Sequence, residues 1–208
     1  MAKRLAVGIT TALLFTAFAF PTPLPPASID IITDIRRIST ILIFRMLLGL
    51  VPAFLGLRGV PVPAKAMGWK RPAGRDYLTA AALAVGTLGL GLLFPSDGLV
   101  DTAARVGTAV WILLAILVVV SAAAEEIFFR SWLLRALPFL GAGPGLSAVL
   151  SVALFALVHA GAGWPPVVFA AVAGILYTSA FLTRECIWTV LAAHAVHNAL
   201  AFAWHAVR

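Results

Sequence analysis

The feature that most constrains this chain is an apolar helical pattern over about residues 106–137 that carries two adjacent carboxylates, Glu125 and Glu126. At a rise of 1.5 Å per residue such a helix is roughly 48 Å long, whereas the hydrocarbon core of a bilayer is about 30 Å thick. The helix must therefore tilt, protrude or break. Because an ionisable side chain at membrane depth costs at least a few kcal/mol, we expect the pair to be functional and not only to mark a polar helix end.

The composition is that of a membrane protein. Of 208 residues, 62% are hydrophobic and only 11% are charged, whereas a soluble domain is about half apolar and roughly a quarter charged. The sequence therefore predicts an all-α, polytopic transmembrane helical bundle. The net charge of +7 is explained by Lys and Arg in cytoplasmic loops beside an anionic lipid bilayer, so no nucleic-acid partner is implied. The single Cys186 excludes an internal disulfide and a Cys-rich metal site.

The apolar runs predict about seven spans, with six to eight as the range. The expected spans are residues 5–20, 38–57, 78–94, 106–137, 146–160, 167–182 and 187–204. The first run also fits a signal peptide with a cleavage site near Ala17-Phe-Ala19, but an uncleaved first span is favoured. The second span contains Arg45, which we expect to snorkel or to pair within the bundle. The basic loop 58–77 should be cytoplasmic.

We expect one integral membrane domain in two parts. Residues 1–105 would hold the N-terminal transmembrane helices and the basic cytoplasmic loop, and residues 106–208 would form the catalytic helical core. The small residues throughout, including 17 Gly, suit close packing of helices in lipid.

Further polar side chains lie in the apolar helices that follow, namely His159, His194 and Asn198. The turns at 138–145 and 183–185 should face the same side of the membrane, because two spans separate them. Counted from these turns at 1.5 Å per residue, Glu125, His159 and Asn198 each lie at roughly 20 Å and His194 at about 13 Å. The sequence therefore predicts that these four side chains meet at one depth. A lone intramembrane histidine more often bonds to a neighbouring helix, and His197 and His205 are given that interpretation.

Such a set can hydrolyse an amide without a serine or cysteine nucleophile. A carboxylate in an apolar bundle can act as a general base and, beside a histidine, can take a proton from water. A second histidine and an asparagine on one helix face can donate hydrogen bonds to the oxyanion. Glu125, His159 and His194 also fit a catalytic zinc with one open position. The spacing is not that of His-Glu-x-x-His on one helix, so we expect no cofactor, with zinc as the alternative.

The residues fall into three motifs that resemble those of a known family. These motifs are Glu125-Glu126-x-x-x-Arg130, Phe155-x-x-x-His159 and His194-x-x-x-Asn198. They are similar to the core motifs of the CPBP family of intramembrane proteases. This family comprises the type II CAAX prenyl endopeptidases and the bacteriocin-processing, or Abi, proteins, with sortase-like members. The stretch 169–177, with Gly174, resembles a weaker middle motif, and the whole resemblance covers about residues 110–205.

The resemblance implies a glutamate-dependent intramembrane endopeptidase. On this basis Glu125 would activate water with His159 assisting, His194 and Asn198 would form the oxyanion site, and Glu126 and Arg130 would support the helix. Two positions depart from the family pattern: Ser131 replaces the usual glycine, and His197 adds an imidazole beside Asn198.

The resemblance implies a membrane-anchored protein or peptide as substrate. Prenylated CAAX proteins are expected in eukaryotes. The short, Ala-rich chain with a basic N-terminus is typical of a bacterial inner membrane, where a bacteriocin precursor or a C-terminal sorting tail would be cut. We therefore expect a multi-pass protein of the cell membrane.

Two alternatives without protease activity stay open at this point. The first is a haem- or metal-binding membrane protein that uses His159 with His194 or His197. The second is a proton-coupled membrane protein in which Glu125 and His159 carry protons. The second is disfavoured because the two halves of the chain show no pseudo-repeat and no pair of broken helices.

Overall fold

The computed structural model describes residues 2–19, 67–94 and 107–206, together with residues 35, 36, 39, 40, 42–44, 46, 47 and 51. The regular elements in these parts are all helices, which confirms the predicted helical membrane bundle. They are α1 (Ala2–Ala19), α3 (Gly74–Gly91), α5 (Thr108–Glu126), the π-helix η1 (Ile127–Leu133), α6 (Leu134–Leu140), α7 (Pro144–Leu157), the 3₁₀ turn η2 (Ala160–Ala162), α8 (Trp164–Arg184) and α9 (Ile187–Ala206).

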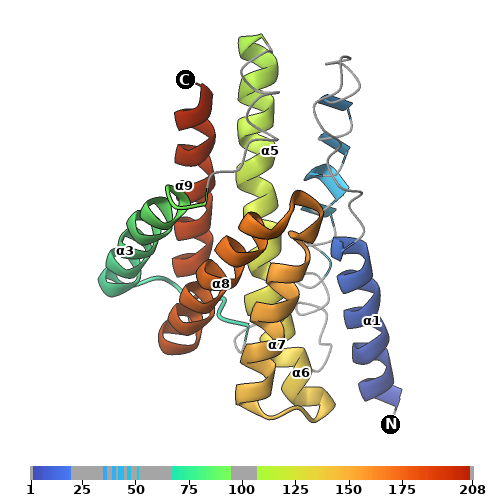
Figure 1. The fold of residues 1–208 in the computed structure, drawn as a ribbon. Helices are drawn as coiled ribbons and strands as arrows, with labels where there is room; N and C mark the ends of the chain where they lie inside the picture. The colour runs from blue at the N-terminus through green and yellow to red at the C-terminus, as the bar shows by residue number, and fades with distance from the viewer. Residues whose placement is uncertain are drawn as a thin grey trace.

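Helices α5 and α9 lie side by side at the centre of the bundle (Figure 1). Helix α3 packs obliquely against α9, α7 pairs with α8, and α1 lies against α6. The turn between α6 and α7 and the turn between α8 and α9 both lie in the lower half of this view. This arrangement agrees with the prediction that these two turns face the same side.

Four of the described helical segments are long and apolar enough to cross a membrane. They are Thr108–Leu140, Pro144–Ala162, Trp164–Arg184 and Ile187–Trp204. They correspond to the last four predicted spans. The first predicted span coincides with α1, whereas the second, including Arg45, falls largely outside the described residues.

One predicted boundary was wrong. The third span was expected at 78–94, but α3 begins at Gly74 because Asp76 in its first turn accepts a hydrogen bond from the Ala73 N–H at 2.7 Å. This start includes Arg75 and Asp76, and α3 is not among the four apolar candidates. The fifth span, expected at 146–160, agrees with the apolar segment Pro144–Ala162, within which α7 ends at Leu157 and the chain turns at His159.

The long helix that follows residue 107 changes its pitch within the bundle. It runs for 33 residues from Thr108 to Leu140, and its middle section Ile127–Leu133 is π-helical. Pro138 lies inside the last section, and the helix ends at Gly141, whose positive φ of 109° gives a left-handed cap. A π-helical segment inserts extra residues into a helix and is common at functional sites. Here it begins directly after Glu126.

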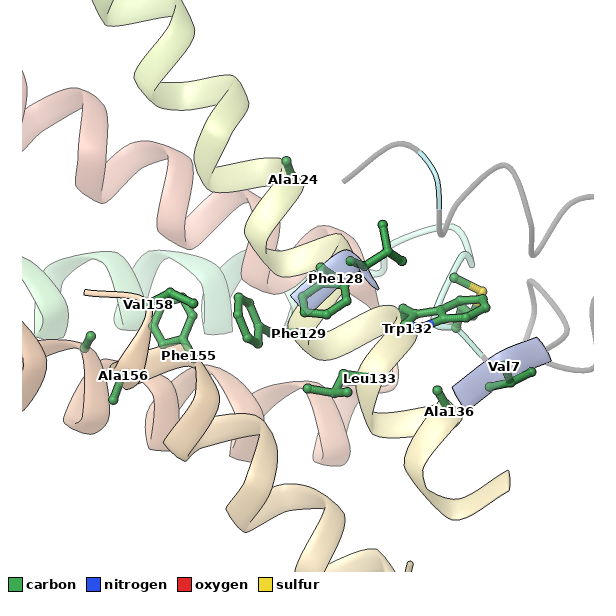
Figure 2. Close-up of a cluster of buried hydrophobic side chains, with 13 residues drawn as sticks. Val7, Ala124, Phe128, Phe129, Trp132, Leu133, Ala136, Phe155, Ala156 and Val158 are labelled. Carbon is green, nitrogen blue, oxygen red and sulfur yellow. The ribbon is translucent and has the colours of Figure 1, made fainter. Parts of the chain in front are cut away.

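The side chains of the π-helical segment are buried, and residues of α7 pack against it. Phe128, Phe129 and Trp132 are fully buried, and Phe155 of α7 lies beside Phe129 with ring centroids 5.3 Å apart (Figure 2). The Ser151 hydroxyl of α7 donates to the Phe129 carbonyl at 2.8 Å. Because a widened helix pairs its own backbone less regularly, these external contacts stabilise it.

Two further hydrogen bonds connect the π-helical segment to the N-terminal half of the chain. The Ser131 hydroxyl donates to the Met67 carbonyl at 2.7 Å, and the Trp132 indole N–H donates to Thr11 of α1 at 3.1 Å. Ser131, where the family usually has glycine, is therefore a buried structural contact.

Asp76 ties α3 to the turn between α8 and α9. Its carboxylate accepts hydrogen bonds from the Ala73 N–H at 2.7 Å and from the Arg184 Nε at 2.8 Å, and Thr189 of α9 lies 3.4 Å away. The Ala73 N–H, and then Arg184, hold the pKa of Asp76 below its ordinary value, and burial opposes them. This carboxylate fastens the oblique helix to the core.

We predict that D76N lowers the melting temperature in detergent by about 3–6 °C, because the charged hydrogen bonds of Asp76 are lost. A depressed folded pKa stabilises the protein above the unfolded pKa of about 4, and this stabilisation is lost as the pH falls through the folded value. The difference between wild type and D76N should therefore shrink below about pH 4. The exposed Glu185 offers E185Q as the control. A constant difference down to pH 2 would contradict this role.

Candidate active site

The centre of the polar cluster is the carboxylate of Glu126, which is completely buried. One oxygen, Oε1, accepts a hydrogen bond from Arg130 Nη1 at 3.0 Å and lies 2.8 Å from Nδ1 of His194. The predicted i,i+4 pairing of Glu126 with Arg130 is thus confirmed. The contact with His194 joins the end of α5 to the middle of α9, across 68 positions of sequence.

Each of the two histidines uses its Nδ1 in a hydrogen bond that orients the ring. Because an ionised carboxylate only accepts, His194 donates from Nδ1 to Glu126. His159 likewise donates from Nδ1 to the Phe155 carbonyl at 2.8 Å. In each neutral ring the remaining nitrogen, Nε2, then carries the lone pair and can accept a proton.

The Phe155 ring contacts residues of all three motifs. The Arg130 guanidinium carbon lies 4.0 Å from the centroid of the Phe155 ring, close enough for a cation–π contact. The same ring meets His159 edge-on at 5.1 Å and His194 edge-on at 6.1 Å. One phenylalanine thus contacts a residue from each of the three motifs.

Because Gly174 of α8 has no side chain, Phe155 and Arg130 can lie close to its backbone. A Cβ at this position would lie 3.2 Å from Phe155 Cδ1 and 3.5 Å from Arg130 Nη2. The glycine of the weak middle motif therefore allows α8 to approach the guanidinium and the ring closely.

The other predicted site residues lie around this cluster. Glu125 is 5% exposed, and its charge acts on both Arg130 and Tyr177. Asn198 is one turn beyond His194 on α9 and is partly exposed. His159 is also partly exposed, but it lies in the turn after α7 and not inside a helix as the sequence suggested.

The sequence did not assign a role to Tyr177, which contacts the site directly. Its ring stacks on His194 with centroids 5.3 Å apart and planes 28° from parallel. Its spacing of three residues from Gly174 was the available signal, because i,i+3 positions share a helix face.

His197 differs from its predicted environment. Its ring is buried and stacks on Phe169 of α8 at 5.2 Å. Within the described part of the chain its Nδ1 has no hydrogen-bond partner, so it is not the hydrogen-bonded core histidine that was expected. The side chain of His205 lies outside the described residues.

The cluster lies in a part of the chain that matches a protein-family model. The family model of type II CAAX prenyl endopeptidase Rce1-like proteins matches residues 107–200, the part of the chain that contains all three motifs. These residues are similar to that family. The resemblance to the CPBP intramembrane proteases is thereby confirmed. Comparisons with curated proteins and with solved structures gave no match.

The match of residues 107–200 to the Rce1-like family indicates a protease, and thus a hydrolase, of the CAAX type. The four apolar helices and the family together indicate a multi-pass membrane protein in a lipid bilayer with a protein or peptide substrate.

The alternative zinc site does not form in this arrangement. Among the described residues, no three His, Cys, Asp or Glu side chains are grouped closely enough to hold a metal ion, so Glu125, His159 and His194 do not form a ligand set here. We therefore route no step of the proposed mechanism through a metal.

Alanine substitutions at Gly174 of α8 and, as a control, at Gly86 of α3 test how closely the site is packed. We predict that G174A lowers both thermal stability and proteolytic rate, because the new methyl displaces Phe155 by a few tenths of an ångström. The control is G86A on α3, where nothing lies within 4 Å of the added Cβ. Alanine in a helix interior is favoured over glycine by about 1 kcal/mol, so G86A should raise the melting temperature by roughly 2–4 °C. Equal stabilisation by both substitutions would contradict close packing at Gly174.

Proposed function

We propose that this protein is an intramembrane endopeptidase that hydrolyses a peptide bond of a membrane-associated protein or peptide with water activated by Glu125 and His159. The observation that supports this most strongly is the buried contact between Glu126 and His194, which brings together the first and third motifs of an Rce1-like domain.

Glu125 is proposed as the residue that removes a proton from water. It is buried beside the cluster, and its neighbour Glu126 is already committed to Arg130 and His194. His159, whose Nδ1 bonds the Phe155 carbonyl, is proposed to assist Glu125 as a second base. The activated water would attack the carbonyl carbon of the scissile bond. One water proton would pass to Glu125 or His159.

His194 and Asn198 are proposed to stabilise the oxyanion of the tetrahedral intermediate. They occupy one face of α9 because they are four residues apart. To donate from Nε2 to the oxyanion as well as from Nδ1 to the Glu126 carboxylate at 2.8 Å, His194 must carry two protons. When the intermediate collapses, the carbon–nitrogen bond breaks and the leaving amine takes the proton held by Glu125 or His159.

Glu126 and Arg130 are proposed to orient the site and not to react. The guanidinium neutralises a carboxylate that would otherwise be an unpaired buried charge, and it stacks on Phe155. This pair holds His194 at a defined angle to the substrate carbonyl.

The proposed substrate is a single-pass or lipid-anchored polypeptide that reaches the site from the bilayer of the cell membrane. A prenylated C-terminal CAAX peptide, a bacteriocin precursor and a C-terminal sorting tail are the three substrate types that the family resemblance suggests.

The direct test is proteolysis by the purified protein in liposomes, with the three substrate types present and the products identified by mass spectrometry. We expect E125Q and H159A each to lower the rate by about 10²–10⁴-fold, the usual contribution of a general base. Both variants should insert and unfold like wild type. E126Q should instead lose stability as well as activity, because Glu126 is the buried partner of two other groups.

The matched control is E185Q, which neutralises an exposed glutamate at the turn between α8 and α9. Its rate should equal that of wild type. Full cleavage by E125Q would overturn the role of Glu125. An intense Soret absorbance of the purified protein would instead support haem binding at the histidines.

A further inference from the structure

We infer that Thr87 on α3 is a positioning residue for the active-site His194 and that it acts through Tyr177. Thr87 lies outside the matched residues 107–200, so the N-terminal half would contribute to the site of the Rce1-like domain. This inference rests on the proposed proteolytic function and names a further residue on which that function depends.

The first step is the contact between Tyr177 and His194. The two rings stack with centroids 5.3 Å apart and planes 28° from parallel, so the phenol ring covers one face of the imidazole. Phe155 meets His194 edge-on at 82°, and Glu126 takes its Nδ1. With these three contacts the imidazole has little freedom to rotate. If the Tyr177 ring moves, the direction of Nε2 changes with it.

The second step is the hydrogen bond that holds the Tyr177 ring. Its hydroxyl donates to Thr87 Oγ1 at 3.3 Å, across the packed faces of α8 and α3. Thr87 in turn donates to the Leu83 carbonyl at 2.9 Å, one turn earlier on α3. Both side chains are almost completely buried. The phenol proton is therefore directed away from the reaction, and the hydroxyl acts as an anchor for the ring.

The third step follows from how α3 itself is placed. Helix α3 packs against both α8 and α9, and Asp76 at its start holds Arg184 of α8. The position of Thr87 relative to His194 is thus defined by helices on both sides. Because the helices fix this buried hydroxyl pair in place, the pair can hold the Tyr177 ring, and through it the His194 imidazole, in position to within less than an ångström.

The test uses threonine and tyrosine variants of the full protein in liposomes. T87V removes the acceptor while keeping the shape of the side chain, and Y177F removes the donor while keeping the stacked ring. Each should lower kcat by about threefold to tenfold, as expected for one buried hydrogen bond, with KM unchanged. The double variant should be no slower than either single variant, because both remove the same interaction.

Two further variants separate positioning from general structure. T87S keeps the hydroxyl and should restore kcat toward the wild-type value. T79V removes a hydroxyl from the same helix that donates only to its own backbone at Arg75, and it should leave kcat unchanged. If T87S is as slow as T87V, or if the double variant multiplies the losses of T87V and Y177F, the inference is overturned.

A measurement without proteolysis distinguishes this inference from the proposed function. In protein labelled with ¹⁵N-histidine, T87V and Y177F should shift the ring signals of His194, and T79V should not. If the wild type cleaves no substrate but these shifts are seen, the positioning holds and the protease assignment fails. If proteolysis is normal and the His194 signals are unmoved in both variants, the positioning role is wrong.

Discussion

The structure depends on one buried carboxylate oxygen that is shared by an arginine and a histidine. Glu126 Oε1 receives Arg130 from one turn further along the same helix and His194 from the last helix of the bundle. A buried carboxylate is costly unless its charge is paired. Arg130 and His194 must both reach this oxygen. These two contacts therefore define how α5 and α9 are rotated about their own axes. The catalytic proposal follows from that rotation.

The π-helical segment allows this arrangement. It follows Glu126 directly and carries Arg130, three buried aromatic rings and Ser131. The aromatic rings fill the space between α1, α7 and the loop at Met67, while serine hydroxyls bond backbone carbonyls across the same boundary. The segment therefore combines a dry apolar shell with one charged pair. Electrostatic contacts are stronger in such an apolar environment than in water.

Much of this could be predicted from the sequence, because hydropathy and spacing are local properties. The runs of apolar residues predicted the last four spans, and the i,i+4 spacing predicted the pair of Glu126 and Arg130. The sequence could not predict that His194 contacts Glu126, because that choice depends on how two helices rotate against each other. It also missed the end of α7 before His159, and the contact of Tyr177 with Thr87 of α3, since both arise from packing between distant segments. The division at residue 105, the catalytic roles of Glu125, His159, His194 and Asn198, and the supporting roles of Glu126 and Arg130 stay predictions.

The central claim is that Glu126 and His194 interact directly inside the bundle. A double-mutant cycle with E126Q, H194Q and the combined variant, read out as the free energy of unfolding in mixed micelles, tests it most directly. A charge-assisted buried hydrogen bond predicts a coupling energy of about 1.5–3 kcal/mol. Losses of stability that add to within about 0.5 kcal/mol would show that the two side chains do not touch, and would contradict the site described above.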